Sequence, residues 1–194
     1  AGLTDANTTF SKTPNDWTNK DVTVTASTTE KNFALQTKKD NGEWQTTGTQ
    51  TFTENGTIYA RLWDGINAGA ETKLNVTNID KLVPNAFTPK ATVTTNSIKV
   101  DGTTTDATAT STNGSSGIKE YRFSKDGGKT YTNAQTSATY TFSRLTQNVE
   151  YTIVVEAKDN AGNTITGTVK ATTGTVPTAS GATYTPNTWT KGNV

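Results

Sequence analysis

The chain has 194 residues, enough for one large domain or two small ones, and its formal net charge is only +1. It contains no cysteine, histidine or methionine. These absences exclude a disulfide framework, the common zinc sites and the histidine base of serine and cysteine hydrolases. The interspersed charges provide no basic face for nucleic acid, and no apolar run is long enough to span a bilayer.

The composition predicts a folded, all-β protein. Hydrophobic residues make up 30% of the chain, and the mean hydropathy is −0.64. Disordered chains of this polarity usually carry a high net charge and few aromatic or β-branched residues, whereas here both kinds recur regularly. Threonine, the commonest residue, favours extended backbone because its branched Cβ restricts χ1. No window shows the 3.6-residue apolar spacing of a helix.

The first half predicts a series of short strands separated by turns. Residues 22–26 alternate apolar and polar side chains, the pattern of a half-buried strand. A second strand starts at Phe33 and reaches a turn at 39–42, whose Asn-Gly pair predicts a tight hairpin returning through 43–46. Further strands are expected at 49–52, 57–63 and 73–77. This spacing is typical of a β-sandwich.

The second half repeats the plan after a proline hinge at 82–84, because strands rarely run through proline. A Gly/Ser-rich loop at 111–117 separates its early strands from its later ones, and a second hinge is expected at 176–177. The expected strands are 91–95, 97–100, 121–124, 129–131, 139–142, 151–157 and 164–172.

An internal repeat supports two domains per unit. Residues 185–194 (TPNTWTKGNV) match residues 13–22 (TPNDWTNKDV) at Thr, Pro, Asn, Trp, Thr and Val, an offset of 172 residues (185 − 13). We therefore interpret the chain as part of a tandem array. The expected organisation is an N-terminal tail (1–8), an immunoglobulin-like sandwich (9–83), a fibronectin III-like sandwich (84–176), and a linker with the start of the next repeat (177–194).

Two resemblances carry these family names. Residues 121–130 (YRFSKDGGKT), Leu145 and residues 151–163 (YTIVVEAKDNAGN) resemble a fibronectin type III module of bacterial surface proteins. Residues 17–24 (WTNKDVTV), 55–61 (NGTIYAR) and 76–81 (VTNIDK) resemble the bacterial immunoglobulin-like repeats of Gram-positive surface proteins. The resemblance implies sandwich folds that serve as spacers or adhesive modules and share no active site. A shared fold does not assign a ligand.

The strand at 57–63 provides the candidate binding residues. Burying Arg61 without a partner would be costly, so Ile58, Ala60 and Leu62 are expected to face the core. This register places Tyr59, Arg61 and Trp63 on the outer sheet face, near Trp44. An exposed aromatic row of this kind could bind a glycan by stacking, or a host protein. It could equally cover the sheet, with Arg61 against an aromatic ring.

Two acidic turns and a tryptophan have competing interpretations. Residues 126–128 and 159–163 offer oxygen atoms to a cation, but Asp and Asn also cap turns through backbone amides. We favour ordinary turns and expect no metal and no cofactor. Trp17, repeated as Trp189, is either a wedge between modules or a core tryptophan of the first strand.

These patterns predict a non-enzymatic spacer with no catalytic residues, located outside the cell, on its surface or in its wall. We expect a monomer whose partners are the neighbouring repeats of the same chain. The alternatives are an adhesive module that binds a glycan or a host protein through the outer aromatic face, and a phage tail-associated decoration domain.

Overall fold

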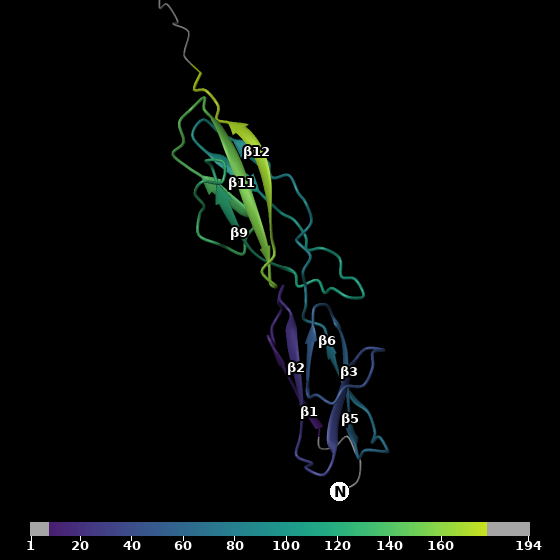
Figure 1. The fold of residues 1–194 in the computed structure, drawn as a ribbon. Helices are drawn as coiled ribbons and strands as arrows, with labels where there is room; N and C mark the ends of the chain where they lie inside the picture. Colours follow the sequence, from purple (N-terminus) through teal and green to yellow (C-terminus); the bar gives the residue numbers. More distant parts are fainter. Residues whose placement is uncertain (1–7, 178–194) are drawn as a thin grey trace, which may run out of the picture.

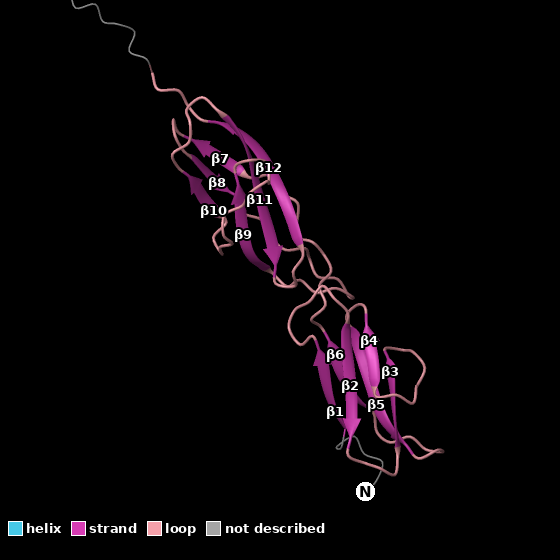
Figure 2. Cartoon of the chain, turned by 60° about the vertical axis from the view of Figure 1, so that its left-hand side comes forward, coloured by secondary structure: helices cyan, strands magenta, loops and turns pink. Residues whose placement is uncertain are grey.

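In the computed structural model, the described residues are 8–177, and they form twelve β-strands and no helix. Six strands precede residue 77 and six follow residue 89, and Figures 1 and 2 show them as two bodies set end to end. All pairings between named strands are antiparallel. The predicted all-β fold class is confirmed. Within residues 8–177, nothing has the helical length and hydrophobicity needed to cross a membrane.

The first domain contains two three-stranded sheets, ordered β1-β2-β4 and β3-β5-β6. From β2 to β5, successive strands alternate between the two sheets, as expected for a sandwich, while β1 pairs with β2 and β6 with β5. The strands are β1 (Thr8–Thr13), β2 (Val22–Thr28), β3 (Ala34–Lys39), β4 (Thr49–Phe52), β5 (Gly56–Trp63) and β6 (Thr72–Val76).

The second domain repeats this arrangement with sheets ordered β10-β8-β7 and β12-β11-β9. A bulge interrupts the β9–β11 pairing between Lys158 and Asp159, next to the β11–β12 turn. The strands are β7 (Lys90–Val93), β8 (Ile98–Asp101), β9 (Ile118–Ser124), β10 (Thr139–Phe142), β11 (Glu150–Asp159) and β12 (Thr164–Thr172).

Alternation along the long central strands builds each core. In β5, Ile58, Ala60 and Leu62 are buried, which confirms the predicted register. In β11, Ile153 and Val155 are wholly buried, while Tyr151, expected on the same face, is half-buried. Each fully buried aliphatic side chain of valine size or larger contributes about 1.5–3 kcal/mol by leaving water, so these alternating residues hold the sheets together.

Two predicted return strands, 43–46 and 129–131, are wrong. After the turn that follows β3, only Gln45 makes an isolated bridge, to Thr37, and the chain crosses to the other sheet, where β4 pairs with β2. The same crossing occurs in the second domain, where Gln135 bridges Tyr121. The Asn-Gly turn forms locally, but the opposite sheet provides the pairing partner for the next strand.

One strand was missed in the sequence. β1 has a single large apolar residue, Phe10, among threonines, serine and lysine, so its alternation was too weak to recognise. Among residues 8–177 it is an edge strand paired only with β2, and its pairing depends on backbone hydrogen bonds. The repeated segment 185–194, with Trp189, lies outside the described residues.

Candidate functional site: the domain junction and the outer face of the first domain

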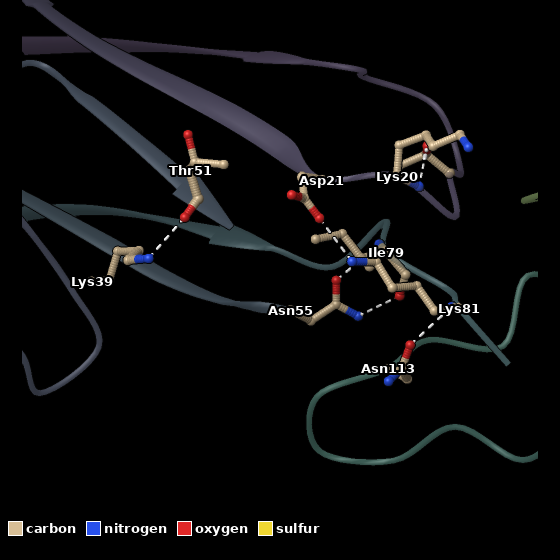
Figure 3. Close-up of polar contacts among 9 residues, drawn as sticks. Lys20, Asp21, Lys39, Thr51, Asn55, Ile79, Lys81 and Asn113 are labelled. Carbon is tan, nitrogen blue, oxygen red and sulfur yellow. Dashed lines mark hydrogen bonds and ion pairs between the residues drawn. The ribbon is translucent and has the colours of Figure 1, made fainter. Parts of the chain in front are cut away.

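The segment that follows β6 is tied to the first domain by backbone and side-chain hydrogen bonds. Thr18 donates its N–H to the carbonyl of Asn78 (3.0 Å) and accepts the N–H of Asp80 (2.9 Å), as in a short parallel bridge. The Asn55 amide bonds Ile79 in both directions: Nδ2 donates to the Ile79 carbonyl (3.0 Å), and Oδ1 accepts the Ile79 N–H (2.9 Å). Figure 3 shows this two-way contact. The segment 78–80 is therefore fixed to the first domain.

The same segment is also bonded to the 102–117 connection of the second domain. Gly114 donates its N–H to the Ile79 carbonyl (2.8 Å), and Asn113 Oδ1 accepts the N–H of Lys81 (2.9 Å, Figure 3). A direct bond from Asn55 N–H to the Thr112 carbonyl (2.8 Å) joins the two domains without the linker. The carbonyl of Ile79 thus accepts one hydrogen bond from Asn55 of the first domain and one from Gly114 of the second.

The β11–β12 hairpin of the second domain docks on the same end of the first domain. The Ala161 carbonyl accepts the N–H of Asn19 (3.2 Å), and Asn163 Nδ2 donates to the Asp80 carbonyl (2.9 Å). Asp159 shapes the hairpin, since its Oδ1 accepts the N–H groups of Gly162 (2.7 Å) and Asn163 (2.8 Å). The predicted turn chemistry of 159–163 therefore also builds a contact surface.

Trp17 lies at this junction, in the β1–β2 connection. A Cβ atom added to Gly114 would lie 2.4 Å from Cζ3 of the Trp17 ring, so the ring packs directly on the glycine backbone of the second domain. Trp17 is 39% exposed and stands outside the named strands. Of the two interpretations made from the sequence, the geometry favours a contact between modules over a core tryptophan of the first strand.

Three carboxylates meet at the junction. Oxygen atoms of Asp80, Asp106 and Asp159 lie within 4.8 Å of one another, and Asp80 and Asp159 are wholly buried. Backbone N–H groups satisfy them: Ser116 donates to Asp80 Oδ2 (2.9 Å), and Gly117 donates to Asp106 Oδ2 (2.6 Å). Burial raises the pKa of Asp159 above its ordinary value, and the nearby Asp80 charge raises it further. Carboxylate oxygens are also the ligands that hard cations take, so a cation would find three of them here.

The other acidic turn behaves as the sequence predicted. Asp126 Oδ2 accepts the Thr130 hydroxyl (2.6 Å), and its Oδ1 accepts the N–H groups of Thr130 (2.9 Å) and Lys129 (3.0 Å). These hydrogen bonds, with that of the Thr130 hydroxyl foremost, hold the pKa of Asp126 well below its ordinary value. Asp126 caps its own turn.

The predicted binding residues come together on the outer face of the β3-β5-β6 sheet. The Arg61 guanidinium carbon lies 4.1 Å from the Trp44 ring centroid and 5.4 Å from that of Trp63. Lys38 Nζ lies 4.9 Å from the Trp44 centroid and 5.3 Å from that of Tyr59. We call these five residues the cation–aromatic row. Lys38 is the member that the sequence did not reveal, because Trp44 reaches it from an irregular segment outside the strands.

Comparisons with known proteins leave the family open. No family model matches the chain, and no curated protein matches it. Among solved structures, domains A168–A170 of titin are 12% identical, with a TM-score of 0.49, over 88% of this chain and 67% of that one. The fibronectin(III)-like modules of Clostridium thermocellum CbhA are 17% identical, with a TM-score of 0.39, over 86% and 94%. The FN1–FN3 domains of chicken CNTN1 are 15% identical, with a TM-score of 0.36, over 82% and 62%. At these values the likeness assigns no function.

Proposed function

We propose that this chain is a non-enzymatic structural spacer of a multidomain protein found on the cell surface, in the wall or outside the cell. The observation that supports the proposal is the junction, where Ile79 and Asp80 are hydrogen-bonded to both domains at once. A spacer must hold its domains at a set distance and angle. A flexible connection would let them reorient, as in most chains with small interdomain contacts.

The junction restrains bending through many small contributions. A typical hydrogen bond contributes a net of about 1 kcal/mol, and a buried polar group that loses its partner costs about 1–3 kcal/mol. Asn55 is central because its side chain holds Ile79 while its backbone N–H reaches Thr112. By contrast, the exposed ion pair between Lys81 and Asp21 (2.8 Å, Figure 3) contributes little.

Electron–electron distance measurements between spin labels test the proposal. The chain has no cysteine, so Lys31→Cys and Lys99→Cys place one label in each domain without other changes. A narrow distance distribution is expected, because the junction holds the domains in one arrangement. Asn55→Ala should broaden it, while Asn133→Ala, an exposed asparagine of the second domain, should not. A broad distribution in the labelled chain that keeps Asn55 would overturn the spacer function.

A further inference from the structure

The outer faces of the two domains neutralise their positive charges differently. On the second domain, strands β9, β11 and β12 carry cross-strand ion pairs: Arg122 with Glu156 (2.7 Å), Lys158 with Glu120 (3.5 Å) and Lys170 with Glu150 (3.0 Å). Each of these three cations thus has a carboxylate partner.

The corresponding face of the first domain has cations without such partners. None of the ion pairs between described residues involves Lys38, Arg61 or Lys73. The partners of Arg61 are uncharged: Gln36 Oε1, which accepts from Nε (2.9 Å), and the tryptophan rings. Aromatic rings and amides orient a cation without cancelling its charge. This face therefore retains a positive field.

The strand register places these groups side by side on one face. Tyr59 of β5 lies opposite Lys38 of β3 on one side and opposite Lys73 of β6 on the other. Two strand spacings separate the lysine backbones, about 10 Å. Arg61, two residues along β5, lies opposite Gln36 on the same face. Two carboxylates, Glu43 and Glu71, are exposed and lie outside the strands, and Glu71 lines a surface pocket together with Tyr59 and Lys73.

We infer that this face binds an acidic polysaccharide. Lys38, Arg61 and Lys73 would contact its carboxylate or sulfate groups, and the rings of Trp44, Tyr59 and Trp63, which are half-buried, would contact the apolar faces of its sugars. An acidic peptide would need the cations but not the rings, and it would gain most by pairing along a free sheet edge rather than across the central strand β5. This inference goes beyond the spacer function and does not depend on it.

The direct test is binding of the full chain to polygalacturonate, with neutral dextran and poly-L-glutamate as comparison probes. We expect polygalacturonate to bind with a dissociation constant at least about tenfold lower than that of either comparison probe, and to weaken as salt screens the charges. Equal binding of poly-L-glutamate would overturn the inference in favour of an acidic protein partner. Binding no stronger than that of dextran would overturn it entirely.

Matched variants locate the site. Lys38→Gln combined with Lys73→Gln should weaken polygalacturonate binding about tenfold, because two cations are lost. Lys170→Gln removes one exposed lysine from the ion-paired face of the second domain and should leave binding within about twofold. Lys73→Gln alone changes an exposed side chain of β6, so this variant is expected to fold like the unmodified chain. If Lys170→Gln weakens binding as much as Lys73→Gln, the site is not on this face.

Discussion

The two domains carry equivalent hairpins that differ in what surrounds them. The β5–β6 turn begins at Asp64 and the β11–β12 turn at Asp159, and each aspartate accepts two backbone N–H groups on its Oδ1. Asp64 is exposed, and the N–H groups of Asn67 and Ile66 lower its pKa below the ordinary value. Asp159 is buried at the junction, and its pKa is raised. Docking against the other domain therefore reverses the direction in which the aspartate pKa is shifted in two otherwise equivalent turns.

The difference shows that a turn motif can acquire a second role through burial alone. In the free hairpin, water surrounds the carboxylate, so its hydrogen bonds dominate. In the docked hairpin, the loss of water and the charge of Asp80 oppose ionisation. Changes to these turns should therefore affect the two domains unequally wherever docking matters, and equally wherever only the local turn matters.

The largest difference between the two domains in lost free energy of unfolding is expected when the aspartates are removed. Asp159→Ala removes the acceptor of the Asn163 N–H and leaves the Gly162 N–H only its longer contact with the Asp159 carbonyl (3.3 Å), so it should lower the free energy of unfolding by about 2 kcal/mol. Asp64→Ala should cost much less, since water replaces the carboxylate at an exposed turn. Denaturant unfolding of both variants measures the difference. Similar losses would contradict the claim that docking matters.

A smaller inequality is expected for the asparagines at the ends of the turns. Asn163→Ala removes the bond to the Asp80 carbonyl (2.9 Å) and that to Asp159 Oδ2 (2.8 Å), so it should cost about 1 kcal/mol. The side chain of Asn67 makes only a 3.5 Å contact to Asp64 Oδ2 in the open, so Asn67→Ala should have little effect. The same unfolding measurement, with spin-label distances for Asn163→Ala, separates a stability loss from loosening of the junction.

The contributions of Asp159 and Asp64 to the free energy of unfolding should change with pH in opposite directions. The pKa of Asp159 in the folded state is raised above its value in the unfolded chain. Ionisation of Asp159 therefore lowers the free energy of unfolding as the pH rises from the unfolded pKa through the folded pKa. The free energy of unfolding of the unmodified chain, minus that of Asp159→Asn, should therefore increase as pH falls from 7 toward 4. For Asp64, whose pKa is lowered, the matching difference against Asp64→Asn should decrease as pH falls below the unfolded value. Slopes of the same sign for the two differences, measured by denaturant unfolding at each pH, would refute this assignment.

The smallest inequality is expected at the glycines. Gly65 and Gly162 have φ values of 103° and 99°, and no neighbouring atom lies closer than 3.6 Å to an added Cβ at Gly162 or within 4 Å at Gly65. Backbone strain is then the shared cost, so Gly65→Ala and Gly162→Ala should each destabilise by about 1–2 kcal/mol. A much larger loss at Gly162, measured by thermal unfolding, would show that docking also depends on the turn backbone.

The sequence predicted what depends on neighbouring residues. Alternation located the core positions of β5 and β11, and burial cost placed Arg61 on the outer face. The sequence did not reveal the junction, because Asn55, Ile79 and Gly114 are distant along the chain, and the motifs that contain Asn55 and Ile79 do not indicate that these residues meet. The carboxylates of Asp80 and Asp106 were missed for the same reason. The failed hairpin at 43–46 shows that a good turn does not decide which strand pairs next.

The direction of β1 and β6 has a mechanical consequence. Both strands run toward the junction, and the Thr18–Ile79 bridge between the segments that follow them is parallel. A stretching force along the long axis of the first domain would act on the start of β1 at one end and on the end of β6 at the other. Such tension would load the strand ladders lengthwise, so that their hydrogen bonds share the force instead of separating one at a time.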